Sequence, residues 1–285
     1  MAGPEKAVVF YSGGIMSWAA AKRTVQKYGA ENTTLLFTDT GIEDADLYRF
    51  LDESAENVGA RLIKHSDGRD VWQVFNDVKM IGNSMADPCS EHLKRKPGQQ
   101  WIKDNCDPND TALVFGIHWE EMHRLEGMRT NRKGKRVMGG VRPRYNALGW
   151  HHVEAPMCDK PWMTAGQIYA WLKMEGIERP RLYDMGFAHN NCGGFCVKAG
   201  EGHFVHLLRE IPDLYAYHEE QERLFNESRP GRAVQTVLAP QRRQPDGSVK
   251  RVPMTLKKFR EEVAENDSQI NMFDIGGCGC FSDEG

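Results

Sequence analysis

The sequence predicts an α/β fold, in which a doubly wound parallel sheet with helices on both faces is followed by a mostly helical, cysteine-bearing cap. Through the first 130 residues, short apolar segments alternate with amphipathic ones, which is typical of such a sheet. A glycine-rich turn joins the first apolar segment directly to the first helical one. Most of the cysteines lie beyond residue 130, which assigns them to the cap.

Strands are expected at 8–11, 34–38, 61–64 and 112–117, and helices at 16–28, 46–58, 71–78, 91–105 and 120–127. Further helices are expected at 164–176, at 200–227 with a break at Pro212, and at 255–266. We therefore divide the chain into an α/β core, 1–130, and a cap of helices and loops, 131–285.

Composition limits the function classes. The chain has 285 residues, 40% of them hydrophobic, which is enough for a sizeable core, and its net charge of −3 implies no global attraction to nucleic acid. The first residues do not resemble a signal peptide and no apolar run approaches a membrane span, so we expect a cytoplasmic protein without membrane contact. Seven cysteines in such a chain indicate metal or redox chemistry rather than disulfides.

The first turn has the features of a phosphate-binding site. Ser12, Gly13 and Gly14 follow the first strand, and Ser17 lies in the helix that begins next. Glycines allow positive φ and close backbone approach, and a helix N-terminus offers N–H groups to an anion. No Gly-Lys-Ser/Thr follows, so this is not the P-loop of kinases and GTPases. The alternative is an ordinary strand-to-helix turn.

A second candidate stretch, Asp39-Thr40-Gly41, ends the second strand. Ligands of parallel sheets bind beyond the carboxyl ends of the strands, so Asp39 is placed to hold Mg²⁺ or a ribose hydroxyl. The alternative is a capped turn that opens the next helix. Glu43 or the phosphates themselves are the other candidate holders of Mg²⁺.

Three cysteines are candidates for one site. Cys192 and Cys196 lie in a glycine turn, and Cys89 precedes a helix whose expected N-cap, Ser90, marks a position that lowers the pKa of a thiol. We expect these three to hold a [4Fe–4S] cluster. The alternatives are a Zn²⁺ site completed by a histidine, either His189 or His203, and free thiols without metal.

The other cysteines are assigned separately. Cys106 and Cys158 have no partner at a useful spacing and are expected to be packing residues. Cys278 and Cys280 lie in a glycine-rich tail. Either one is a fourth ligand, or the tail is mobile and Cys280 carries a thiolate or persulfide to the site, the role that the glycines favour.

The segment 129–144 has seven basic residues and no acidic one, together with three glycines and a proline, and is expected to be a loop. Either it is a solvated excursion, or it is a lid on polyphosphate or a contact to a nucleic-acid backbone. In the second case Arg132, Lys133, Lys135 and Arg136 provide the charge.

Several of these stretches resemble known family motifs. The Ser-Gly-Gly turn resembles the PP-loop, Ser-Gly-Gly-x-Asp-Ser, of the adenine nucleotide α-hydrolase superfamily, with Met16 in place of the Asp. Asp39-Thr40-Gly41 is similar to the Asp-Thr-Gly segment of the phosphoadenylyl-sulfate (PAPS) reductase family. Three further stretches are similar to that family's Cys-Thr-x-x-Leu-Lys-x-x-Pro, Gly-x-Arg-x-x-Glu-Ser-x-x-Arg and Leu-Tyr-Asp-x-Gly-Phe…Cys-x-x-Cys elements, and they lie at 89–97, 116–124 and 182–196.

These matches depart from the family at three points. His118 replaces the first Arg of the second element, Met122 replaces its Ser, and one extra residue separates Cys192 from Cys196. The resemblance implies a HUP-type α/β fold and an adenine nucleotide ligand. It also implies that Lys94 and Arg124 contact negatively charged oxygens.

The resemblance leaves more than one reaction open. We expect an ATP pyrophosphatase that adenylates an acceptor for sulfur transfer, with a nucleic acid or nucleotide as acceptor and a sulfur-donor protein as possible partner. The first alternative is a PAPS-type sulfonucleotide reductase. The second, which Met16 favours, is a nucleotide-binding regulatory subunit without turnover. The sequence does not indicate an oligomeric state.

Overall fold

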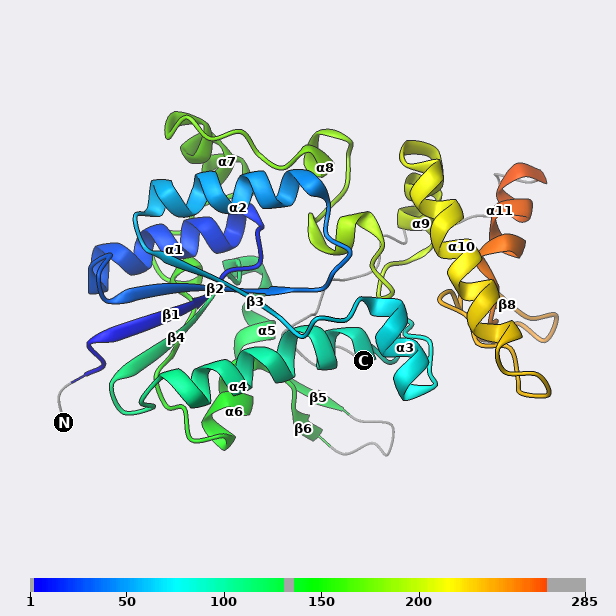
Figure 1. The fold of residues 1–285 in the computed structure, drawn as a ribbon, viewed down its shortest axis with the longest axis horizontal. Helices are drawn as coiled ribbons and strands as arrows, with labels where there is room; N and C mark the ends of the chain where they lie inside the picture. Colours follow the sequence, from blue (N-terminus) through cyan, green and yellow to red (C-terminus); the bar gives the residue numbers. More distant parts are fainter. Residues whose placement is uncertain (1–2, 131–135, 266–285) are drawn as a thin grey trace.

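The structure, a computed structural model, describes residues 3–130 and 136–265, without the side chains of 128–130 and 136–138. Its centre is a five-stranded parallel sheet in the order β3-β2-β1-β4-β7 (Figure 1). The strands are β1 (Lys6–Phe10), β2 (Thr33–Asp39), β3 (Arg61–Ser66), β4 (Thr111–Phe115) and β7 (Val153–Glu154). The chain order reverses at β1, so the carboxyl ends of β1 and β4 form the switch point where ligands of such sheets bind.

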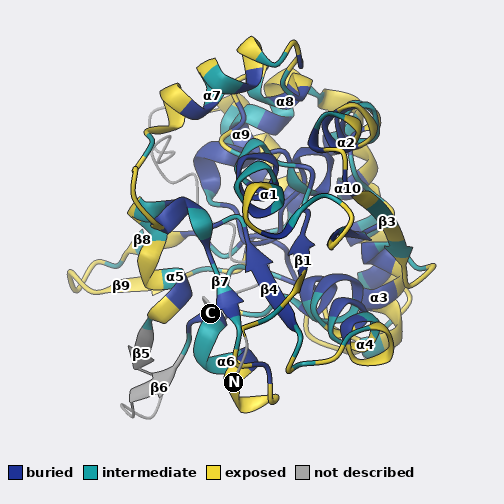
Figure 2. Cartoon of the chain, turned by 90° about the vertical axis from the view of Figure 1, so that its left-hand side faces the viewer, coloured by how far each residue is buried: buried dark blue, intermediate teal, exposed yellow. Residues whose placement is uncertain are grey.

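Helices cover both faces of the sheet. Val9 and Val114 pack on one helical layer, whereas their neighbours Val8 and Leu113 pack on the other, because successive strand residues point to opposite faces. The first layer consists of α1 (Ile15–Tyr28), α2 (Ala45–Val58) and α7 (Ala165–Met174), and the second of α4 (Lys96–Asn105), α5 (Met122–Glu126) and α6 (Val141–Ala147). Figure 2 shows β1 and β4 buried between exposed helix surfaces.

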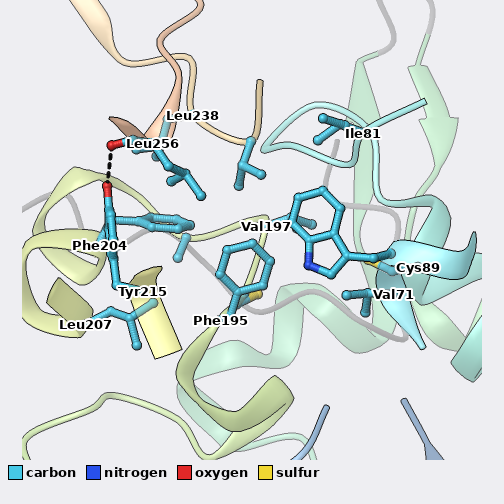
Figure 3. Packing of buried hydrophobic residues seen from close by; sticks show 14 of the residues in the cluster. Val71, Ile81, Cys89, Phe195, Val197, Phe204, Leu207, Tyr215, Leu238 and Leu256 are labelled. Atoms are coloured by element: carbon cyan, nitrogen blue, oxygen red, sulfur yellow. Dashed lines mark hydrogen bonds between the residues drawn. The ribbon is translucent and has the colours of Figure 1, made fainter. Parts of the chain in front are cut away.

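A separate hydrophobic cluster lies beneath the helices of the cap. It is formed by α3 (Val71–Val78), α9 (Glu201–Glu210), α10 (Pro212–Glu227) and α11 (Leu256–Glu265). Figure 3 shows Phe195, Phe204 and Cys89 within this cluster, and the hydroxyl of Tyr215 donating to the carbonyl of Leu256 at 2.8 Å. Because α3 comes from the first half of the chain, the cap and the sheet domain share this core.

Short elements complete the described chain. They are the π-helix η1 (Ser90–Arg95), the 3₁₀ turns η2 (Trp119–Glu121), η3 (Pro156–Cys158) and η4 (Asn191–Gly194), helix α8 (Arg181–Asp184), and the hairpins β5 (Met128–Thr130)–β6 (Arg136–Met138) and β8 (Gln241–Arg243)–β9 (Val249–Arg251). None of the helices in the described ranges is both long and apolar enough to cross a bilayer.

The predicted α/β fold with a parallel sheet is confirmed, but three finer expectations are wrong. The sheet does not end near residue 130, since β7 is its fifth strand. The segment 129–144 is not one loop: it contains β5, β6 and the start of α6, where Pro143 lies in the first turn and needs no N–H partner. Ser90 is not an N-cap, because Cys89 before it already has helical backbone angles.

Glu222 is a buried carboxylate that joins α10 to α11. Its oxygens accept hydrogen bonds from the backbone N–H of Val237 at 2.9 Å and of Leu256 at 2.6 Å. Burial raises the pKa of Glu222 from 4.5 to about 7, although the two N–H groups act in the opposite direction. The native protein therefore binds this proton more tightly than the unfolded chain does, and between pH 4.5 and 7 this contribution to stability decreases as the pH rises.

Replacing Glu222 by Gln is expected to remove this pH dependence. The unfolding free energy of Glu222→Gln minus that of the natural protein should be about 1–3 kcal/mol larger at pH 8 than at pH 5. Urea unfolding at the two pH values measures the difference, in which the contributions of other titrating groups cancel. Glu220→Gln, on the exposed side of α10, is the control. A difference between Glu222→Gln and the natural protein that does not change with pH would contradict the assignment.

Candidate functional site

A cavity of about 670 Å³ lies at the carboxyl ends of β1 and β4. Ser12, Gly14, Ser17 and Gly116 border it, and its volume is in the range of small-molecule sites. The predicted phosphate-binding turn is therefore at the switch point of the sheet.

The turn has the geometry of an anion site. Gly13 has φ of +77°, and a side chain there would also meet Leu47 at 2.9 Å. Gly14 is the N-cap of α1 and has no side chain to accept hydrogen bonds from the first N–H groups of the helix. The hydroxyl of Ser17 donates to the carbonyl of Gly14 at 2.8 Å. The first turn of α1 has no acidic residue to compete with an anion. Met16 borders the cavity, so the position that carries Asp in the PP-loop contributes an apolar side chain here.

Gly116 allows β4 to approach α1 closely. A Cβ at this position would lie 2.7 Å from the Cα and 2.8 Å from the N of Ser17, which is too close for any side chain. The sequence analysis named Gly116 only as part of a motif. A glycine directly after a buried strand is the signal that indicates such a contact.

Cationic side chains border the same cavity. Lys94 and Arg124 both line it, as the resemblance implied, and Arg124 pairs with Glu121 at 2.6 Å. Arg179, which the sequence did not indicate, also lines it, with its guanidinium 4.3 Å from the ring centre of Tyr169. The cavity thus combines helix N–H groups with positive charge, as a polyphosphate requires.

The sequence analysis missed one polar group that lines the cavity and considered another only as a zinc ligand. Asn190 is buried and donates to the carbonyl of Gly13 at 3.2 Å, and its Oδ1 has no hydrogen-bond partner among the described residues. Nδ1 of His189 likewise has no hydrogen-bond partner among the described residues. Burial lowers the pKa of His189 to about 3, so the ring is neutral. His203, the other candidate zinc ligand, stacks on His189 and bonds the carbonyl of Gly194. Both orphaned atoms are available to a ligand.

The Asp39 segment lies at the strand end but outside the cavity lining. The carboxylate of Asp39 accepts hydrogen bonds from the hydroxyl of Tyr48 and from the N–H of Gly41, each at 2.9 Å. Thr40 points the other way, toward Glu43, with 2.8 Å between its Oγ1 and Oε1 of Glu43. The role of Asp39, Thr40 and Gly41 in ligand binding stays a prediction.

The structure brings the three candidate cysteines together. Cys89, Cys192 and Cys196 line one small cavity of about 20 Å³, which Thr40 and Lys94 also border. Nζ of Lys94 lies 3.9 Å from Sγ of Cys192. Lys94 therefore borders both the large cavity and the cysteine cavity.

The metal prediction is not tested by this arrangement. Within residues 3–130 and 136–265, no three or more His, Cys, Asp or Glu side chains are positioned to hold a metal ion. The tail cysteines Cys278 and Cys280 lie outside the described residues, as do Arg132, Lys133 and Lys135, while Arg136 is described only by its backbone.

The two remaining cysteines have different surroundings. Burial raises the pKa of both Cys106 and Cys158 to about 11, and Cys158 donates to the carbonyl of Ile117 at 3.4 Å. Thiols with such pKa values are protonated at neutral pH and unreactive, which agrees with the predicted packing role.

A profile of the phosphoadenosine phosphosulfate reductase domain matches residues 6–195, which include the phosphate-binding turn, Lys94, Arg124 and Cys192, and which end one residue before Cys196. The chain belongs to this family. Within the PAPS reductase domain family, which is part of the adenine nucleotide α-hydrolase superfamily, the match extends past residue 130 and so includes β7 and α7.

Comparison with individual proteins provides weaker evidence than the domain profile. A crystal structure of phosphoadenylyl-sulfate (PAPS) reductase from Candida auris, in complex with phosphate, is similar over 63% of this chain and 78% of that one, with 13% identity and a TM-score of 0.38. No curated protein matches the chain. The family assignment therefore depends on the domain profile.

The contact at Gly116 is testable by a matched pair of substitutions. Gly116→Ala should lower the free energy of unfolding by about 1–3 kcal/mol, because its methyl group overlaps the backbone of Ser17. Gly166→Ala, also at the cavity but in α7 with open space around it, should be neutral or stabilising by up to about 1 kcal/mol. Urea unfolding measures both. Equal effects of the two substitutions would contradict the proposed close packing.

Proposed function

We propose that this protein binds ATP in the large cavity, cleaves it between the α and β phosphates, and uses the adenylate to activate an acceptor for sulfur transfer. The observation that carries the proposal is the position of Lys94, whose side chain borders both the phosphate-binding turn and the cysteine cavity. A site that couples nucleotide cleavage to sulfur chemistry needs the two groups of residues to meet in this way.

In the first step, an acceptor oxygen attacks the α phosphorus and pyrophosphate leaves. Negative charge accumulates on the leaving group, and the N–H groups at the start of α1, together with Lys94 and Arg124, are positioned around the cavity to stabilise it. Mg²⁺ would be held by the phosphates, since Asp39 and Glu43 use their carboxylates within the protein.

In the second step, the terminal sulfur of a persulfide attacks the activated carbon of the acceptor, forming the carbon–sulfur bond and releasing AMP. A second thiol then attacks the sulfur–sulfur bond, which releases the thiolated acceptor and leaves a disulfide. A cation beside a thiol stabilises the thiolate, and Lys94 is the cation beside Cys192. Cys280 remains our proposed carrier of a thiolate or persulfide. A sulfur-donor protein would supply the persulfide.

The [4Fe–4S] cluster remains part of the proposal as a cofactor, with Zn²⁺ as the alternative. Cys89, Cys192 and Cys196 remain the proposed ligands because they line one cavity, although in the described part of the chain these three side chains are not positioned to hold a metal ion. A cluster with one open iron would supply a site for sulfide. No step above depends on it.

A sulfonucleotide reductase is the second candidate, and the family assignment is compatible with either reaction. A thiolate would attack the sulfur of the bound sulfonucleotide and displace the adenosine phosphate. A second thiol would then release sulfite and leave a disulfide. The same cavity and the same cysteines serve this reaction, so the nucleotide that the protein accepts decides between the two.

Incubation with α-labelled ATP and with PAPS in separate reactions tests the proposal. We expect release of AMP and pyrophosphate, slow without acceptor. Lys94→Ala and Ser17→Ala should each reduce turnover by roughly 10²-fold or more, because each removes a group that stabilises the developing charge. Lys96→Ala is the control, since Lys96 is exposed and pairs with Glu91.

Other outcomes of this experiment contradict the proposal. Binding and reduction of PAPS without binding of ATP would establish the reductase reading. Binding of ATP without turnover, with any acceptor tested, would establish the regulatory reading instead.

The metal content of anaerobically purified protein tests the cysteine site. We expect iron in the natural protein, loss of iron in Cys192→Ser, and retention in the control Cys106→Ser. In the double variant with Cys278→Ser and Cys280→Ser, retained iron with intact ATP cleavage and lost sulfur transfer would support the carrier role of Cys280, whereas lost iron would make the tail a ligand. Zinc without iron in the natural protein would contradict the cluster.

A further inference from the structure

Trp162 is a large apolar side chain that remains exposed. About half of its surface, 51%, is accessible, although it lies in the segment between η3 and α7 rather than at a loop tip. Its ring stacks on that of Trp119 in η2, with 5.7 Å between the ring centres and 22° between the planes. Two indoles from distant parts of the sequence therefore form one aromatic surface, the Trp119–Trp162 platform.

Hydrogen bonds fix the platform in place. The indole N–H of Trp162 donates to the carbonyl of Cys158 at 3.1 Å, and that of Trp119 donates to the carbonyl of Met163 at 3.0 Å. Arg23 donates to three carbonyls of the same segment, those of Pro156, Asp159 and Pro161, at 2.7, 3.2 and 2.6 Å. An exposed indole held this firmly is ordered before a ligand arrives, which lowers the entropic cost of binding.

Residues close in sequence to both tryptophans line the large cavity. Trp119 is between Ile117 and Glu121 in the sequence, and both of these line the cavity. On the other side, Ala165 begins α7 shortly after Trp162 and also lines it. Both tryptophans are therefore connected to the cavity lining through short stretches of chain.

A positive charge accompanies the exposed ring. Nζ of Lys160 lies 5.1 Å from the ring centre of Trp162, and the side chain of Lys160 is exposed. The ammonium group lies over the ring, so a base that stacks on Trp162 would take its place, and Lys160 could then pair with the phosphate of the same nucleotide. Stacking of this kind tolerates any sequence but requires an unpaired base.

We propose that the Trp119–Trp162 platform binds a single-stranded nucleic acid, with one unpaired base stacked on Trp162 and an adjacent phosphate at Lys160. This inference depends on the proposed function and specifies its acceptor as a nucleic acid with an unpaired base. Because the net charge of the protein is negative, a nucleic acid is not attracted to the protein as a whole, and binding must depend on a local site such as this one.

Fluorescence anisotropy tests the proposal with a labelled 12-nucleotide RNA strand, a DNA strand of the same sequence, and the RNA annealed to its complement. The natural protein should bind the single strands in preference to the duplex. Trp162→Ala should weaken single-strand binding by about 5- to 100-fold, the effect of losing one stacked base, and Trp162→Phe should retain most of the affinity. Tyr217→Ala, which removes an exposed aromatic from α10, should have no effect.

Three results would overturn the proposal: no binding of either single strand at low salt, equal binding of the duplex, or equal affinities for Trp162→Ala and the natural protein. The last of these would leave the indole as a contact for another class of partner, such as the sulfur donor. ATP binding by the natural protein is measured in parallel, so that this inference and the proposed function can fail separately. A protein that binds the single strands but does not bind ATP would contradict only the proposed function. The RNA and DNA strands distinguish the two sources of the acceptor.

Discussion

The carboxylate of Glu43 is the point at which the sheet, the cysteine turn and the large cavity are connected. It is almost fully buried, accepts hydrogen bonds from Thr40 at 2.8 Å and from the N–H of Cys192 at 2.5 Å, and lies 3.6 Å from Nζ of Lys94. Burying a carboxylate and an ammonium costs free energy, and their attraction offsets it only if the remaining hydrogen bonds are satisfied. The main effect of Glu43 is therefore to position two side chains. It holds Cys192 in a left-handed conformation, with φ of +55°, and it holds Lys94 between the two cavities.

The same constraint explains the close packing around the phosphate-binding turn. Gly13, Gly116 and Gly193 each lie where a side chain would collide with a neighbouring element, and for Gly193 that neighbour is the carbonyl of Ile42 beside Glu43. Gly116 is thus packed against the backbone of Ser17, and Gly193 against the backbone of the β2 turn, whereas Gly13 is packed against the side chain of Leu47. Little room is left for the site to adjust, so the positions of Lys94 and Cys192 relative to a bound nucleotide are largely set by the fold.

Much of this arrangement could be predicted from the sequence. The apolar periodicity identified the first four strands, and the pattern of strand, glycine turn and helix singled out Ser12–Gly14, where the structure has a cavity. Features formed by tertiary contact could not be predicted: the hydrogen bond from Asn190 to the carbonyl of Gly13 and the stacking of Trp119 on Trp162 join residues far apart in the chain. Local signals were also misjudged. Pro143 was taken to exclude a helix although it lies in a first turn, and Asp246-Gly247, which makes the turn of the β8–β9 hairpin, was not used as a hairpin signal.

Amide hydrogen exchange with and without a non-hydrolysable ATP analogue tests the central claim most directly, namely that one nucleotide site is coupled to the cysteine turn. The account predicts slower exchange in peptides covering residues 11–18, where the nucleotide contacts the start of α1, and in peptides covering 188–196, which Asn190 and Lys94 connect to that site. Exchange in the β8–β9 hairpin should not change. Protection of 11–18 without any change in 188–196 would contradict the coupling, and no change in 11–18 would contradict the site itself.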